Sequence, residues 1–146
     1  MKLPALLVAD LHLTASPADE YRWALFPWLR EVLQQERVAT LNILGDITDA
    51  KDYHPAKLAN RMVGEIQKTS EVVSDLRILM GNHDYLKRNE AFFSFLSHLP
   101  RVRYIDAAWE DLADDGPSVY YQPHTKDPAK DLGGDFTHYD YLFMHQ

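Results

Sequence analysis

In LNILGDITD, residues 41–49, a mostly apolar run ends in a glycine and two acidic residues. A short apolar run bounded by turn residues is typical of a strand buried on both faces of a sheet. Three other stretches share this form: LLVADLH (6–12), LRILMGNHD (76–84) and YLFMHQ (141–146). The sequence therefore predicts four buried strands, each followed by residues that can bind a metal.

The spacing of these stretches indicates how the strands are connected. Asp10, Asp46 and Asn82 follow one another at equal intervals of 36 residues. This is close to the length of one strand, one crossover helix and the return to the sheet. We therefore expect an α/β fold in which the candidate ligands gather at the carboxyl ends of the strands.

The segments between the strands have the apolar spacing of helices. The first begins near Ser16-Pro17, and Pro27 is expected to kink or restart it. The second contains Leu58, Met62 and Ile66, and the third extends over 92–99 with Asn89 as a candidate cap. Beyond residue 100, short strands are predicted at 101–106, 107–109 and 118–123, which either close the sheet or form a second one.

Length and composition favour a single domain over 1–146, because 146 residues with 46% hydrophobic content can bury a substantial core. The absence of cysteine excludes disulfides, thiolate metal sites and cysteine nucleophiles. A net charge of −7 gives no basic surface for tight, nonspecific nucleic-acid binding. The N-terminal apolar run is too short for a signal peptide, so we expect a cytoplasmic protein without a membrane partner.

Three motifs carry the chemistry: Asp10-x-His12, Gly45-Asp46-x-x-Asp49 and Gly81-Asn82-His83-Asp84. Together they supply the carboxylate, amide oxygen and imidazole ligands that divalent cations prefer when thiolates are absent. If the first motif is extended, its two side chains lie on the same side and one ion contacts both. The two glycines allow the chain to turn tightly and to approach a metal or phosphate.

In order and spacing, the three motifs resemble those of the calcineurin-like metallophosphoesterase family. The resemblance implies a layered α/β sandwich that hydrolyses phosphoesters with two divalent metal ions. Asp10 and His12 would bind the first metal, Asp46 would bridge both metals, and Asn82 would bind the second. A hydroxide between the metals would attack phosphorus in line.

The resemblance also implies roles for the residues beside the metals. His83 would face the substrate and protonate the leaving oxygen or stabilise developing charge, and Asp84 would hold its imidazole in orientation. His145 occupies the position of a further histidine that binds the second metal. His54 is a candidate substrate contact, although a polar loop that caps the helix near Pro55 explains it equally well.

The family pattern continues to a G-H-x-H motif that this sequence lacks. Two interpretations are open: a fragment that ends after the fourth ligand-bearing strand, which we favour, or a naturally reduced site. In either case we expect the 146-residue chain to bind metal weakly and to turn over slowly.

We expect Mn²⁺ at this site, with Fe, Zn or Mg as alternatives, because the ligands are oxygen and nitrogen only. The substrate class remains open within the family. The sequence favours a phosphodiesterase, including a nuclease acting on nucleic acid or a nucleotide. The alternatives are a phosphomonoesterase and a non-catalytic protein-binding scaffold on the same fold.

Overall fold

The computed structural model describes the whole chain except residues 52, 88–89, 113–115, 128, 130–132 and 146. Its centre is a parallel four-stranded sheet in the order β1-β2-β3-β6. The strands are β1 (Ala5–Val8), β2 (Thr40–Leu44), β3 (Asp75–Leu79) and β6 (Val102–Ile105). The predicted α/β fold with parallel crossovers is confirmed.

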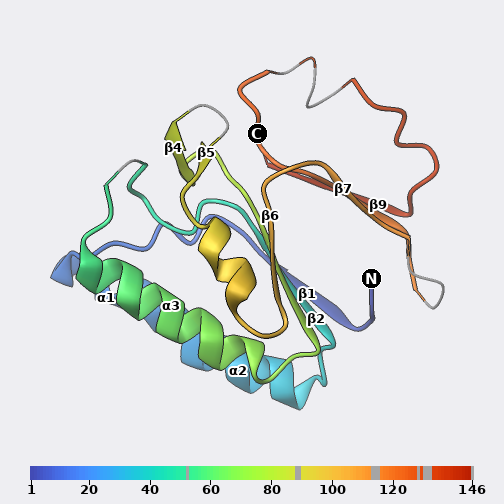
Figure 1. The fold of residues 1–146 in the computed structure, drawn as a ribbon. Helices are drawn as coiled ribbons and strands as arrows, with labels where there is room; N and C mark the ends of the chain where they lie inside the picture. Colours follow the sequence, from blue (N-terminus) through green and yellow to red (C-terminus); the bar gives the residue numbers. More distant parts are fainter. Residues whose placement is uncertain (52, 88–89, 113–115, 128, 130–132, 146) are drawn as a thin grey trace.

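Helices cover one face of this sheet (Figure 1). They are η1 (Pro17–Asp19), α1 (Glu20–Trp23), α2 (Leu25–Gln35) and α3 (Ala56–Ser70). The Ser16 hydroxyl accepts a hydrogen bond from the Ala18 amide and caps the first turn. The chain leaves α1 at Ala24 and starts α2 with Pro27 in its first turn, where proline is tolerated. The predicted helix restart is therefore confirmed.

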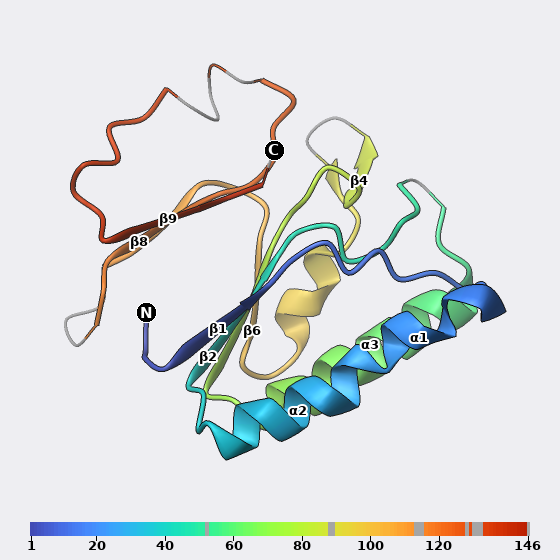
Figure 2. The ribbon, with the colours of Figure 1, turned by 180° about the vertical axis from the view of Figure 1, so that it is seen from behind.

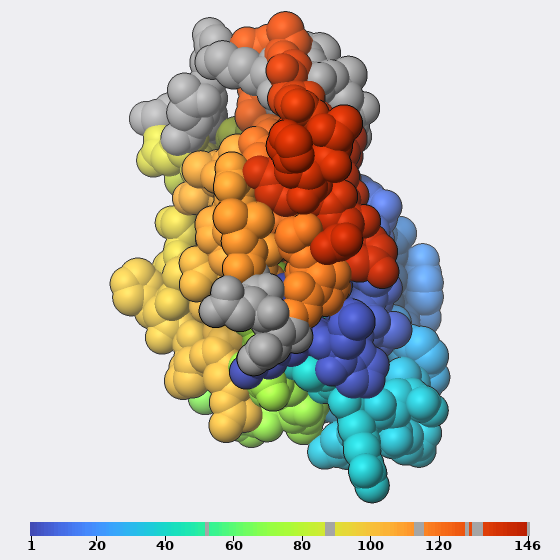
Figure 3. Space-filling view, turned by 90° about the vertical axis from the view of Figure 1, so that its right-hand side faces the viewer, coloured from blue at the N-terminus to red at the C-terminus, as the bar shows by residue number. Residues whose placement is uncertain are grey.

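A second, three-stranded sheet covers the opposite face of the central sheet (Figure 2). It consists of β7 (Trp109–Asp111), β8 (Val119–Gln122) and β9 (Tyr141–Met144), with β9 parallel to β8. Apolar side chains of both sheets form a second core, which includes Leu79, Val119 and Tyr121. In Figure 3 the C-terminal strands lie against the N-terminal residues on this side of the molecule.

Two predictions about individual elements are wrong. The strand of YLFMHQ exists, but it is the partly exposed edge of the second sheet rather than a fully buried strand. The helix predicted over 92–99 is only a short 3-10 helix, η2 (Ser94–His98), which follows the hairpin β4–β5 (Tyr85–Lys87 and Glu90–Ala91). Its aromatic residues pack on one another instead of forming a helical stripe, and the predicted cap Asn89 lies outside the described residues.

A buried polar network joins the two sheets. Arg77 of β3 donates to Asp75 at 2.6 Å, to Asp111 of β7 at 2.6 Å and to the Tyr121 hydroxyl of β8 at 2.8 Å. The Met1 ammonium lies 2.6 Å from the same Asp111 carboxylate. Burial disfavours ionisation of Asp111, but hydrogen bonds from the ammonium and Arg77 outweigh it and hold the pKa of Asp111 below its usual value.

This network predicts an acid-sensitive contact between the sheets. A lowered carboxylate pKa stabilises the fold above the unfolded-state value, and that stabilisation disappears as the pH falls through the folded-state pKa. We expect Asp111→Asn to lower the free energy of unfolding at pH 7 by about 3 kcal/mol, because Arg77 loses a charged partner. Urea unfolding at pH 7 and pH 3 should show a smaller acid effect in the variant. An equal acid effect in both proteins would contradict the assignment.

Candidate metal centre

The loops that follow β1, β2 and β3 meet at the carboxyl edge of the central sheet. The Asp10 amide donates to the Gly45 carbonyl at 3.3 Å, and the His12 amide donates to the Asp46 carbonyl at 3.0 Å. Asp10, His12 and Asp46 all have left-handed backbone conformations, with φ of 53°, 44° and 52°. Such conformations are uncommon for residues with a side chain and concentrate at functional sites. The first motif is therefore not extended, and the prediction of an extended Asp10–His12 segment is wrong.

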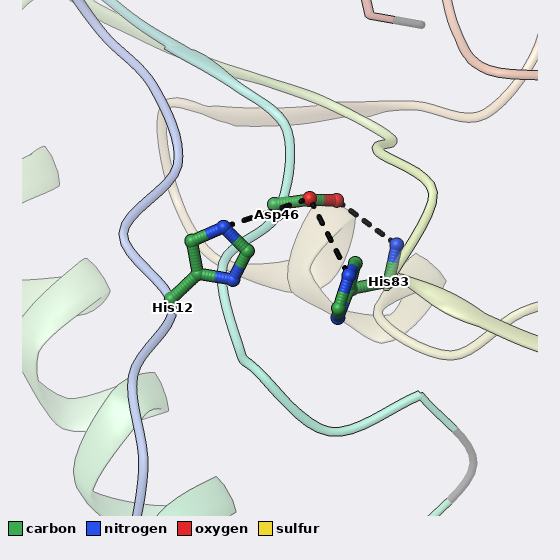
Figure 4. Close-up of side chains that lie close together, drawn as sticks. All are labelled: His12, Asp46 and His83. Carbon is green, nitrogen blue, oxygen red and sulfur yellow. Dashed lines mark hydrogen bonds and ion pairs between the residues drawn. The ribbon is translucent and has the colours of Figure 1, made fainter.

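The side chains at this edge form two groups of potential ligands. His12, Asp46 and His83 form one, and Asp10, Asp46 and His145 form the other; within each group the ligand atoms lie within 4.8 Å of one another. Asp46, whose side chain is 5% exposed, belongs to both groups, and Figure 4 shows it between His12 and His83 of the first group. The shared aspartate agrees with the predicted bridging position. Neither group contains both Asp10 and His12, so the predicted pairing of these two on one metal differs from this geometry.

Side-chain atoms of Asn82, His145 and Asp46 surround one point at this edge of the sheet. The His145 Nδ1 lies 2.7 Å from the Leu44 carbonyl, to which it donates, and its Nε2 lies 3.0 Å from the Asn82 Oδ1. The same amide oxygen lies 2.9 and 3.1 Å from the two carboxylate oxygens of Asp46. In a neutral imidazole with Nδ1 protonated, Nε2 offers only a lone pair. The atoms around this point are then all acceptors.

A cation at this point satisfies that donor set. Without one, the imidazole must carry a second proton, or the oxygen and nitrogen of the Asn82 amide must exchange places so that the nitrogen donates. With a divalent ion, neutral His145, the Asn82 oxygen and the Asp46 carboxylate all act as ligands without rearrangement. A histidine that donates its other ring nitrogen to a backbone carbonyl is also the usual arrangement of a metal ligand. The residues present therefore fit a divalent metal.

The predicted pair of His83 and Asp84 is not formed. The His83 Nδ1 lies 2.7 Å from the backbone carbonyl of Asp49, which leaves Nε2 directed toward Asp46 at 4.0 Å. Asp84 is fully buried and accepts hydrogen bonds from the amides of Asp46, Ile47 and Gly81. The three amides already satisfy the hydrogen-bonding capacity of this carboxylate. The prediction that Asp84 orients the His83 ring therefore differs from the contacts in the structure.

Burial raises the pKa of Asp84 to about 6. The hydrogen bond from the Gly81 amide lowers this pKa, and the negative charge of Asp46 raises it. Because Asp84 accepts hydrogen bonds from amides of both loops, it links the loop after β2, which carries Asp46, to the loop after β3, which carries Asn82.

Two glycines give the side chains of the site their space. A β-carbon on Gly45, whose φ is +89°, would collide with the ring of His145. A β-carbon on Gly81 would collide with the Asp46 carboxylate. The glycines were expected to bring the backbone close to a metal or phosphate; in the structure they make room for the ligands themselves.

His54, the candidate substrate contact, lies in an aromatic cluster. Its ring stacks on Phe92 at a centroid distance of 4.0 Å and meets the edge of Phe93. Its Nε2 lies 2.7 Å from the Thr48 hydroxyl. Among the described residues, the N-cap of α3 is Pro55, which makes no side-chain cap. The contacts of His54 lie beside the loop of Asp46, and its role at the substrate stays a prediction.

The comparison with family models identifies the chain. The model of the calcineurin-like phosphoesterases matches residues 3–145. The chain belongs to this family. Membership explains why the motifs of three loops and the histidine after β9 converge, and it confirms the layered fold. Members of this family generally bind two divalent metals, and the two ligand groups around Asp46 agree with that.

Other comparisons add context to the family assignment. A crystal structure titled nuclease MPE from Pseudomonas putida is similar to the chain at 20% identity and a TM-score of 0.48. The similarity covers 82% of this chain and 56% of that one, so this chain spans little more than half the length of the nuclease. A search of curated proteins gave no match. In the described part of this chain, no helix is long and apolar enough to cross a membrane.

Sequence reasoning missed the backbone contributions to the site. The Asp49 and Leu44 carbonyls orient His83 and His145, respectively. Every residue except proline carries the same backbone donor and acceptor groups, so no residue type marks such a contact.

Proposed function

We propose that this family member is a dinuclear-metal-dependent phosphoester hydrolase that prefers phosphodiesters. The observation that carries the proposal is the Asp46 carboxylate, which belongs to both ligand groups at the edge of the sheet. A buried carboxylate that faces two histidine-containing groups is suited to hold two cations close together.

Mn²⁺ is the proposed metal because the ligands are oxygen and imidazole nitrogen without sulfur. Asp10, Asn82 and His145 would hold one ion together with Asp46, and His12 would contact the other. Bound cations would neutralise charge on the phosphate and lower the pKa of a water molecule. The left-handed backbone at Asp10, His12 and Asp46 holds these side chains in place before any substrate arrives.

His83 is proposed to act on the substrate through Nε2. The hydrogen bond from Nδ1 to the Asp49 carbonyl fixes the ring, and the side chain is 22% exposed, so Nε2 is reachable from the site. A protonated Nε2 can donate its proton to the departing oxygen. His83 also belongs to a ligand group. The test must therefore measure proton donation and metal binding separately.

Hydrolysis of bis-p-nitrophenyl phosphate with excess Mn²⁺ tests the proposal, with p-nitrophenyl phosphate as the monoester reference. We expect metal-dependent turnover that EDTA removes, and faster hydrolysis of the diester. In His83→Ala, turnover should fall by about 10²–10⁴-fold, as for loss of a general acid. The stabilisation that Mn²⁺ gives to the fold should remain, about 2.7 kcal/mol at a hundredfold excess over Kd.

Three outcomes would count against these assignments. No metal-dependent hydrolysis would favour the non-catalytic scaffold. A monoester preference would contradict the phosphodiesterase assignment. Loss of Mn²⁺ stabilisation in His83→Ala would make His83 a metal ligand instead of a proton donor. Glu31→Gln, on the exposed face of α2, is a control that should change neither the turnover nor the stabilisation by Mn²⁺.

A further inference from the structure

A groove borders the candidate metal centre on the side of the first two helices. It has a volume of about 370 Å³, and its lining includes Asp10, Leu11, Tyr21, Arg22, Leu25 and Trp28. Figure 2 shows the segment after β1 leading to α1, which continues into α2. Asp10 belongs both to this groove, called the Trp28 groove below, and to a ligand group. The groove and the candidate metal centre therefore share Asp10.

Two exposed aromatic side chains lie in the Trp28 groove. Trp28 is 54% exposed and Tyr21 is 68% exposed. Together with Leu25 they follow helical spacing, which brings them to one side of the helical segment. The other aromatic residues of this segment, Trp23 and Phe26, are buried in the core. Trp28 therefore does not belong to the core, and no other part of the described chain covers its exposed surface.

Arg22 adds a positive charge beside the Tyr21 ring, with its guanidinium carbon 5.7 Å from the ring centroid and its Nε 3.8 Å from a carboxylate oxygen of Asp19. Its Nη1 donates to the His12 carbonyl at 2.8 Å, and its Nε donates to the Tyr21 hydroxyl at 3.2 Å. The guanidinium thereby joins the loop of His12 to the aromatic surface. A planar apolar surface next to a cation and a metal site matches a ligand that has an aromatic ring at one end and a phosphate at the other.

We propose that the Trp28 groove binds the nucleobase of a nucleotide phosphodiester, stacked on Trp28, while its phosphate lies at the metal centre. This proposal rests on the proposed hydrolase function and names its substrate class. The net charge of −7 disfavours a long duplex, whose binding depends on many basic contacts. A stable protein partner needs roughly 800 Å² on each side, far more than this small groove offers. A single base or a short single strand fits both constraints.

The experiment compares two diesters with the same leaving group: thymidine 5′-p-nitrophenyl phosphate and methyl p-nitrophenyl phosphate. The unmodified 146-residue chain should hydrolyse the nucleoside ester with the higher kcat/KM. In Trp28→Ala, kcat/KM for the nucleoside ester should fall by about 5- to 150-fold, the range for loss of one base–aromatic stack. The methyl ester should change less than twofold, and Trp28→Phe should restore most of the preference.

Binding measured without turnover separates this proposal from the proposed function. Calorimetric titration with thymidine 5′-monophosphate in Ca²⁺ should give weaker binding for Trp28→Ala than for the unmodified chain. If neither ester is hydrolysed but this difference in binding appears, the hydrolase proposal fails and the base site stands. Tyr141→Ala, an exposed aromatic on β9, is the control.

An equal loss on both esters, or no difference in nucleotide affinity, would overturn the assignment. A change of oligomeric state in Trp28→Ala, measured by analytical ultracentrifugation, would make the groove an interface between copies of the chain and would likewise overturn it.

Discussion

Asp46→Asn should abolish metal-dependent hydrolysis, with a loss in kcat of at least about a hundredfold. The carboxylate belongs to both ligand groups, so its replacement by a neutral amide weakens both cation positions at once. Asparagine tolerates the left-handed backbone that this position has, and the variant should therefore fold. A replacement by alanine would confound lost ligation with backbone strain.

The measurement pairs kinetics with metal binding. Hydrolysis of bis-p-nitrophenyl phosphate is followed over a range of Mn²⁺ concentrations, and the melting temperature is recorded with and without Mn²⁺. We expect Asp46→Asn to lose both the turnover and the melting shift. Asp106→Asn, at the end of β6, is a control carboxylate outside both ligand groups and should retain both. Full Mn²⁺ dependence in Asp46→Asn would contradict a bridging role.

The sequence predicted which residues meet at the site better than it predicted how they meet. Apolar runs that end in polar residues identified the ends of β1, β2 and β3, because strand periodicity and parallel crossovers are local properties of the chain. The conformation of the Asp10–His12 segment was wrong, since backbone hydrogen bonds to the next loop impose left-handed residues there. Such bonds join segments far apart in sequence and leave no local signal.

The position of His145 illustrates the same limit. Its strand was predicted correctly, but the apolar run did not indicate to which sheet that strand belongs. β9 pairs with β8 in the second sheet, and the Leu44 carbonyl then turns the ring toward Asn82. The histidine thus reaches the site from the other layer. Sheet assignment depends on pairing partners along the whole chain, which composition does not specify.

Asp84→Ala should be the most destabilising single change at the site. The fully buried carboxylate accepts three backbone amides, at 2.8 Å from Gly81, 3.1 Å from Asp46 and 3.2 Å from Ile47. Removal of the carboxylate leaves these three donors without their acceptor inside the protein, at a total cost of roughly 3–5 kcal/mol, since each buried unsatisfied donor costs about 1–3 kcal/mol. That is comparable to the whole stability of a marginal domain.

Urea unfolding in EDTA measures this effect without a contribution from bound metal. Asp84→Asn should lose less than Asp84→Ala, because its one remaining oxygen can still accept from part of the set. Asp49→Ala, which removes a side chain that is 64% exposed and keeps the carbonyl that orients His83, should change the free energy of unfolding by less than about 0.5 kcal/mol. If Asp84→Ala instead keeps the stability of the unmodified chain, the amide contacts do not hold the loops together.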